Sequence, residues 1–270
     1  MKRVQLFEFE DQAWFPNSMR IAITRLLVVL HKMMGMGYVL SDLISAALKK
    51  SGDDQIVDLG SGSGGSMPQV IEILNDSDDH ANVKMIMTDL YPNTNTISDI
   101  KKLNNKNLTY SETSVNATKL GDAPKGLKTM INSFHHTNPT QAREVLESAY
   151  TNKQAILIYE MAENKIPLII WWLFLPLSIV IMYLMVWLMT PFVKPLTFKQ
   201  LFFTYIIPVI PFFYAWDGQA SMPRIYAMKD IDELLEGLDK NYSWTKEPAK
   251  KPNGRTLGYY VLGVPNKSTV

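Results

Sequence analysis

The sequence predicts an α/β protein with a mostly parallel seven-stranded sheet, a C-terminal β-hairpin and a hydrophobic helical insert. Apolar strand-like segments alternate with helical segments from residue 55 to residue 160, and they lack the in–out alternation of a half-exposed sheet. Two strand-like segments joined by a short polar loop end the chain. Between these parts, the 28 residues from Ile166 to Val193 carry no charge.

These patterns divide the chain into four parts. We expect an N-terminal helical segment (1–50), a ligand-binding core (51–161), a hydrophobic membrane-embedded insert (162–227), and a C-terminal helix and hairpin that complete the core (228–270).

Composition narrows the classes of function. The 270 residues have a net charge of +1, which gives no general surface for nucleic acid, and they include no cysteine for disulfides or metal sites. Residues 1–11 lack the apolar run of a secretory signal, so we expect the core in the cytosol. The oligomeric state stays open.

Two helices are predicted before the core, at 19–34 and 41–50. The first is apolar over more than a narrow stripe and carries Arg20, Arg25 and Lys32. It either packs on the core or lies on a membrane surface with its basic residues toward the headgroups.

The stretch from Gln55 to Gly65 reads as a buried strand that enters a glycine loop, and Ser66 would cap the helix that follows. Such a loop lets the backbone approach a nucleotide-like ligand, and the helix start offers free N–H groups. Gly60, Gly62 and Gly65 fit the dinucleotide pattern G-x-G-x-x-G. Asp58 precedes the loop, and a carboxylate there suits a ligand with an amino group and a sulfonium but repels a pyrophosphate.

The second predicted strand, 83–88, ends at Asp89. Asp89 lies about 25 residues beyond the glycine loop, near the spacing expected for a carboxylate that binds ribose hydroxyls. The alternative is that it caps the turn at Tyr91–Asn93. Further strands are predicted at 108–113, 127–134 and 154–160, and Glu160 ends the last of them.

The insert allows two membrane arrangements. As a helix, 166–193 exceeds the ~20 residues that cross a bilayer core, and tryptophans lie near both of its ends. A second apolar run, 201–216, is short and contains two prolines. Since both ends rejoin one sheet, the insert crosses an even number of times or not at all. The lysines at the tip, Lys194 and Lys199, oppose crossing, and Pro176 could bend the first helix into a V. We interpret the insert as a membrane-embedded hairpin that need not cross fully.

The chain resembles the class I S-adenosylmethionine (SAM) dependent methyltransferases over about residues 50–161 and 228–266. The specific motif is Asp58-Leu-Gly-Ser-Gly-Ser-Gly64, and Ser133-Phe-His-His136 supports it more weakly. The segments Trp216–Gly218 and Arg224–Tyr226 resemble a membrane-associated bacterial subgroup. Of Arg224 we expect either pairing with an anionic group or, by preference, a role as an interfacial anchor.

The resemblance implies a Rossmann-like fold that binds SAM. Gly60, Ser61, Gly62 and Gly64 would lie along the methionyl part, with Asp58 toward the amino end. Asp89 would bind the ribose and Asn116 the adenine. His135 and His136 follow the fourth strand, where methyl transfer takes place in this family, so either could serve as a general base. Alternatively, one histidine only packs in the loop. No carboxylate cluster accompanies the pair at motif spacing, and we expect no metal.

The predicted function is methyl transfer from SAM to an unidentified small-molecule or lipid-like acceptor at the cytosolic face of a membrane. An oxygen, nitrogen or carbon of the acceptor would attack the sulfonium methyl in line. One alternative is a membrane-bound SAM- or nucleotide-binding protein without turnover. Another is an NAD-dependent oxidoreductase, which Asp58 and the terminal hairpin oppose.

Overall fold

The computed structural model describes Met1 and residues 3–266, so the end of the predicted 228–270 part lies outside the described residues. Seven strands form one sheet in the order β3-β2-β1-β4-β5-β7-β6. Strands β1 to β5 run parallel, and β7 lies antiparallel between β5 and β6. The predicted mostly parallel sheet with a C-terminal hairpin is therefore confirmed.

The five parallel strands are short and mostly buried, and the two strands of the C-terminal hairpin are longer. Their bounds are β1 Gln55–Leu59, β2 Lys84–Thr88, β3 Leu108–Tyr110, β4 Leu127–Ile131, β5 Ile156–Glu160, β6 Tyr242–Lys250 and β7 Thr256–Pro265. The α-helices are α1 Asn17–Met34, α2 Met36–Ser51, α3 Met67–Asn75, α4 Thr94–Lys102, α5 Pro139–Thr151, α6 Leu168–Met189, α7 Phe198–Leu201, α8 Val209–Arg224 and α9 Met228–Leu235.

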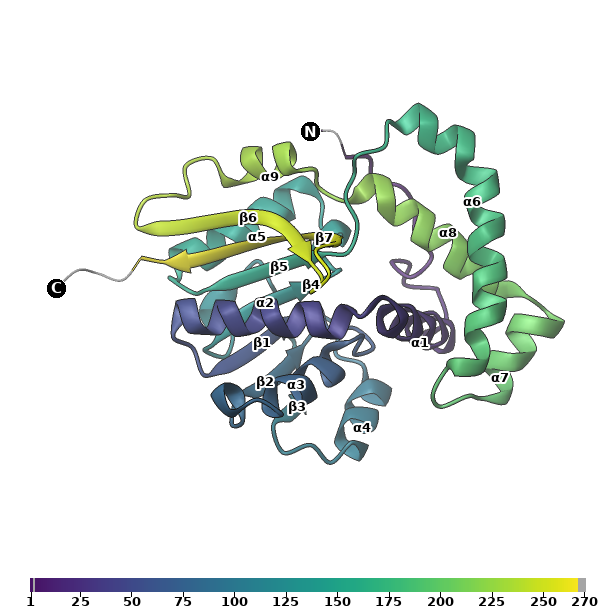
Figure 1. Cartoon of the computed structure of the whole chain (residues 1–270), viewed down its shortest axis with the longest axis horizontal. Coiled ribbons are helices and arrows are strands. Elements are labelled where there is room, and N and C mark those ends of the chain that lie inside the picture. Colours follow the sequence, from purple (N-terminus) through teal and green to yellow (C-terminus); the bar gives the residue numbers. More distant parts are fainter. Residues whose placement is uncertain (2, 267–270) are drawn as a thin grey trace.

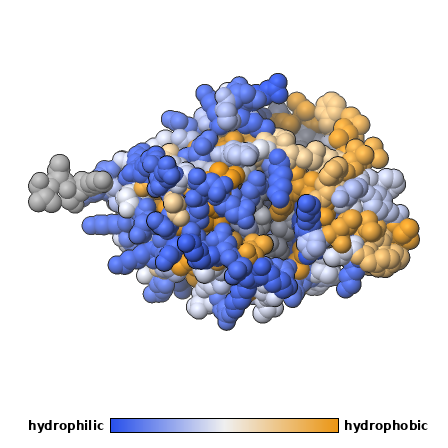
Figure 2. Space-filling view, turned by 60° about the horizontal axis from the view of Figure 1, so that its bottom comes forward, coloured by the Kyte–Doolittle hydropathy of each residue, from blue (hydrophilic) through white to orange (hydrophobic). Residues whose placement is uncertain are grey.

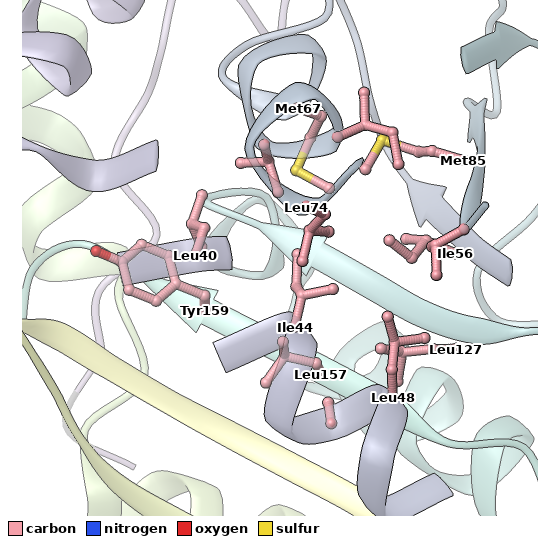
Figure 3. Close-up of a cluster of buried hydrophobic side chains, with 14 of the residues drawn as sticks. Leu40, Ile44, Leu48, Ile56, Met67, Leu74, Met85, Leu127, Leu157 and Tyr159 are labelled. Carbon is pink, nitrogen blue, oxygen red and sulfur yellow. The ribbon is translucent and has the colours of Figure 1, made fainter. Parts of the chain in front are cut away.

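Helices cover both faces of the sheet, as its continuous apolar strands require. Neighbouring residues of β1 point to opposite faces: Ile56 packs under α2, α3 and α4, whereas Val57 packs under α5 and α9. Figure 3 shows the first of these two cores, in which Leu40 and Ile44 of α2 meet Leu157 of β5.

A third apolar core joins the insert to the N-terminal helix. Leu26 and Val29 of α1 pack with Val186 of α6 and with Tyr214 of α8. In Figure 1, α8 lies between α6 and the sheet, and α6 runs along the outer side of the molecule. The insert is thus folded against the rest of the chain.

The structure corrects several predicted bounds. Strand β4 ends at Ile131 instead of residue 134, because Asn132 has a left-handed backbone (φ +50°) and Phe134–His136 form a 3₁₀ turn. Pro176 lies inside α6 without breaking it into a V. The second apolar run is divided at Pro208, where two helical segments meet at 82°.

One helical stretch among the described residues, Leu168–Phe192, is long and apolar enough to cross a membrane. The number rises to three at most if each of two sharply bent helix pairs counts as one span.

Candidate functional site

The candidate site lies at the carboxyl ends of the parallel strands. Strand β1 lies between β2 and β4. The chain adds β2 and β3 on one side of β1 and then β4 and β5 on the other side, so the strand order reverses at β1. In open α/β sheets, ligands bind in the crevice outside such a switch point. The glycine loop, Asp89, Asn116 and the histidine pair all follow strands that end at this edge.

The glycine loop turns sharply after β1. Gly60 and Gly64 have φ values of +66° and +100°, which favour residues without a Cβ. Helix α3 then begins at Met67, directly after Ser66 as expected. However, the Ser66 hydroxyl does not cap the helix, and it bonds instead to Nδ1 of His31 in α1 at 2.8 Å.

Asp58 is buried at the end of β1, with only 3% of its surface exposed. Its carboxylate accepts hydrogen bonds from the Ser61 hydroxyl (2.5 Å) and the Thr129 hydroxyl (2.7 Å). Burial raises the pKa of Asp58 to about 6, although both hydrogen bonds act in the other direction. Asp58 therefore ties the glycine loop to β4, and a role toward a ligand's amino end stays a prediction.

Asp89 faces the glycine loop from the end of β2. Its Oδ2 accepts the Gly62 N–H at 2.9 Å, and its Oδ1 accepts the Tyr91 N–H at 2.8 Å. The alternative that Asp89 caps the following turn therefore holds for its Oδ1, whereas its Oδ2 faces the glycine loop. Each carboxylate oxygen can accept two hydrogen bonds, so capacity remains for a vicinal diol.

Asn116 lies beside Asp89 at the next strand end. Its neighbour Val115 donates its N–H to the Asp89 carbonyl at 2.9 Å. The Asn116 Oδ1 accepts from the N–H and the hydroxyl of Thr118, both at 2.9 Å. These bonds fix the side chain, and its contact with an adenine remains a prediction.

His135 and Glu160 form a buried pair at the ends of β4 and β5. Nδ1 of His135 lies 2.8 Å from Oε2 of Glu160, and the His135 backbone N–H donates to Oε1 at 3.0 Å. A proton on Nδ1 leaves Nε2 as the acceptor nitrogen. Before this pair, the hydroxyl of Ser133 is buried without a hydrogen-bond partner among the described residues, and its Oγ lies 3.6 Å from the position of a Cβ on Gly60.

His136 lies in an acidic environment supplied by the N-terminal segment. Its Nδ1 is 2.8 Å from Asp11 and 3.2 Å from Glu8, and its Nε2 is 3.7 Å from Glu10. Burial lowers the pKa of His136, but the Asp11 hydrogen bond and the three carboxylates outweigh it and raise the pKa to about 9. His136 is therefore protonated at neutral pH and has no lone pair for a base.

Arg224 completes this cluster from the end of α8. It is fully buried, and its Nη1 lies 2.6 Å from Glu8 and 2.7 Å from Asp11. These distances define ion pairs, although the angles fall outside those of hydrogen bonds. Our preferred interpretation of Arg224 as an interfacial anchor is wrong, because no part of its side chain reaches the surface. The anionic partners are carboxylates of the chain itself.

Glu8, His135 and His136 bring potential metal-ligand atoms within 4.8 Å of one another. The guanidinium of Arg224 already neutralises Glu8 at 2.6 Å, and His136 must lose its proton before it can coordinate. The group is better explained as an ion-pair network than as a metal centre, and the expectation of no metal stays a prediction.

Sequence reasoning missed Glu8 and Asp11. They lie more than 120 residues from His136 and more than 210 from Arg224, so only tertiary structure brings them together. The available signal was local: Glu8, Glu10 and Asp11 are acidic residues set among aromatic ones.

Helix α1 lies over the carboxyl edge of the sheet. Asn17 at its start accepts a hydrogen bond from Asn93 at 2.7 Å, close to the end of β2. His31 near its end bonds Ser66 beside the glycine loop. Both ends of α1 are thus attached to the core next to the candidate site.

No protein-family model and no curated protein sequence matches the chain. Among solved structures, the plantazolicin methyltransferase BamL, in complex with a triazolic desmethylPZN analog and SAH, is similar at 12% identity with a TM-score of 0.51; the match covers 92% of this chain and 98% of that one. The methyltransferase domain of bacterial CtHen1 has 11% identity and a TM-score of 0.47, with 84% and 97% covered. Human N-acetylserotonin methyltransferase in complex with SAM has 12% identity and a TM-score of 0.46, with 88% and 56% covered. At this identity, the BamL match shows a shared fold, that of a methyltransferase.

Proposed function

We propose that the protein transfers a methyl group from SAM to an amphiphilic acceptor at the cytosolic face of a membrane. One observation carries the proposal. The loop Gly60–Gly64 after β1 faces Asp89 at the end of β2, with Gly62 bonded to its carboxylate at 2.9 Å. This pairing occurs in a sheet whose antiparallel β7 lies between β5 and β6, the strand order of the methyltransferase fold.

The polar groups at the site suit the functional groups of SAM. Asp89 retains acceptor capacity for two ribose hydroxyls, and the ionised form of Asp58 would attract a positively charged amino end. Asn116 beside Asp89 supplies its Nδ2–H groups for an acceptor on an adenine edge, because Thr118 occupies its Oδ1. When bound, SAM supplies an electrophilic methyl group on a positively charged sulfur.

The chain's own residues would manage the acceptor proton. Glu160 orients His135 through Nδ1, which leaves Nε2 free to accept a proton from the acceptor as the nucleophile attacks. His136 stays charged and cannot share this role. The buried hydroxyl of Ser133 lies between the glycine loop and the histidine pair, where it would orient the acceptor.

The insert supports an amphiphilic acceptor. Helix α6 carries large exposed apolar side chains and begins a few residues after Glu160. A bilayer in contact with this helix would hold lipid-like molecules near the carboxyl edge of the sheet.

Calorimetry on detergent-purified protein tests the cofactor. We expect micromolar SAM binding that weakens at least tenfold in Asp89→Ala, because the ribose loses a charge-assisted acceptor worth roughly 1.5–3 kcal/mol. Asp99→Ala is the matched control, since this exposed carboxylate on α4 forms an ion pair with Lys102 away from the glycine loop. Absence of SAM binding in folded protein would overturn the proposal, and binding of NADH in its place would favour a nicotinamide enzyme.

Labelled SAM distinguishes an enzyme from a binding protein. Incubation with a membrane extract should move label into the lipid fraction, and His135→Gln should lower this transfer by about 10²-fold or more while SAM binding stays intact. Binding without any transfer would identify a SAM-binding membrane protein.

A further inference from the structure

The outer side of the insert exposes many large apolar side chains, and we call this surface the apolar face. Figure 2 shows hydrophobic side chains gathered at one end of the molecule, and Figure 1 places α6 and α7 at that end. Exposed fractions there reach 80% for Ile169 and 78% for Phe198. The most exposed members are Ile169, Leu173, Leu188, Phe192, Phe198 and Ile206. Monomeric soluble proteins rarely expose so many large apolar side chains together.

Most of the charges near the apolar face are basic. Residues 12–41 and 164–216 include no aspartate or glutamate. They do include Arg25 and Lys32 on α1, and Lys194 and Lys199 near α7, whereas Lys165 at the start of the insert is paired with Glu163 at 2.6 Å. Basic residues beside a membrane-facing apolar surface are attracted to anionic headgroups, each by about 1 kcal/mol.

Contacts of the tip decide between crossing and lying flat. The tip of the insert, residues 194–200, is bonded to α1, since Arg25 Nη1 lies 3.4 Å from the Pro195 carbonyl oxygen. Arg25 is eight residues from Asn17 and six from His31, and both of these bond to the core. At ~1.5 Å per residue, Arg25 lies about 10 Å along α1 from each attachment. A bilayer core is about 30 Å thick, so the tip cannot reach the far side.

The core that α1, α6 and α8 share also opposes a crossing of the bilayer by the insert. Crossing by α6 would draw its packing partners into the hydrocarbon with their polar groups. These include Asp217 of α8, whose carboxylate accepts the N–H groups of Phe9 and Glu10 at 2.7 and 3.1 Å. Arg20 of α1 likewise donates to the Glu10 carbonyl at 2.9 Å.

We propose that the protein is monotopic: α6 and α7 lie in the plane of one leaflet, and the basic residues around the apolar face select an anionic bilayer. Helix α1 then lies between the bilayer and the carboxyl edge of the sheet. This inference and the proposed function both require contact with a membrane, but the inference depends on neither SAM nor methyl transfer.

Single cysteines test the topology, because the chain contains none of its own. Lys194→Cys at the tip and Lys106→Cys in the exposed turn before β3 are made separately in the full chain. After expression in bacteria, sealed inside-out and right-side-out vesicles are treated with a membrane-impermeant maleimide. We expect both cysteines to react in inside-out vesicles only. Labelling of the tip from the side opposite to Lys106→Cys would show crossing and overturn the proposal.

Vesicle flotation tests the lipid. We expect the protein to bind vesicles of phosphatidylcholine with about 30% phosphatidylglycerol at least tenfold more tightly than pure phosphatidylcholine, by the attraction of several lysines. The double variant K194E/K199E should lose most of this preference. The control K106E/K125E changes the net charge equally at exposed sites on the core.

Replacement of apolar side chains completes the test. L173S/L188S should weaken binding to both kinds of vesicle, because less apolar area enters the leaflet. Equal binding of wild type and K194E/K199E to anionic vesicles would refute the choice of anionic lipid. Failure of the detergent-free wild type to bind either vesicle, together with a dimer by light scattering, would assign the apolar face to a second copy of the chain. SAM binding measured on the same preparations separates these outcomes from failure of the proposed function.

Discussion

His136 shows how tertiary contacts can reverse the chemistry expected of a residue. A histidine at the end of the fourth strand is a candidate base, but three carboxylates from residues 8–11 and the hydrogen bond to Asp11 hold it protonated. Among the residues that the structure describes, the neighbouring His135 is hydrogen-bonded to a carboxylate through Nδ1 alone. The proposed base is therefore His135.

The raised pKa of His136 predicts a pH dependence of stability. Its folded-state pKa of about 9 exceeds the ordinary 6.5, so the stabilising contribution is complete below pH 6.5 and is lost as the pH rises through about 9. We expect the unfolding free energy of wild type, relative to His136→Gln, to fall by about 3 kcal/mol between pH 6 and pH 10. Denaturant unfolding at several pH values measures this difference. A constant difference would mean that folding does not raise the pKa of His136.

Asp58 predicts a pH dependence of cofactor binding. Burial raises its pKa to about 6, so the carboxylate is charged above this pH and becomes neutral below it. We expect SAM affinity to weaken roughly fivefold between pH 7.5 and pH 5, since an ionic attraction of about 1 kcal/mol disappears. Asp58→Asn should bind with the weaker affinity at both pH values. Calorimetry on both proteins checks this, and a wild-type affinity independent of pH would show that Asp58 serves the loop alone.

Among the elements, β7 depends on a close approach to β5. Gly258 precedes Tyr259, which pairs with Glu160 at the end of β5, and a Cβ on Gly258 would lie less than 2 Å from the Glu160 carbonyl oxygen. Gly254, in the turn before β7, has the same φ of +78° but no atom within 4 Å of its Cβ position. Replacement of Gly254 therefore tests backbone strain alone, whereas replacement of Gly258 tests backbone strain together with steric crowding.

Replacement of each glycine by alanine should have different costs. Gly254→Ala pays only for the left-handed conformation, about 1–2 kcal/mol. Gly258→Ala must also move β7 away from β5, which adds about 1–3 kcal/mol or prevents folding. Urea unfolding of both variants measures the difference. Equal midpoints would contradict the close approach of Gly258 to the end of β5.

In the whole molecule, α1 connects the candidate site with the insert. It bonds the core through Asn17 and His31, it packs with α6 and α8, and its Arg25 bonds the tip. A ligand that orders the glycine loop should therefore also stabilise α1, through the bond between His31 and Ser66.

Hydrogen exchange measures this connection. We expect SAM to slow amide exchange severalfold in residues 17–34 as well as in residues 60–66, because opening of α1 would break its bond to the ordered loop. Helix α9, on the opposite face of the sheet from α3, serves as the internal reference and should not change. Slowing confined to the loop would show that α1 moves independently.

The sequence by itself determined the sheet, the glycine loop and the apolar insert. These features depend on local signals: a continuous apolar strand before glycines, two strands around a polar turn, and a long run without charge. Each signal arises within a few turns of chain, where periodicity and steric preference act directly.

Tertiary structure alone decided the ion-pair network and the position of the insert. Arg224 is buried because Glu8 and Asp11, more than 210 residues away, neutralise it, and no local pattern encodes such a pairing. The tip of the insert returns to α1 because apolar side chains of three distant helices pack together. Burial and charge pairing act between whatever groups the fold brings into contact, so their outcome becomes visible only once the chain is folded.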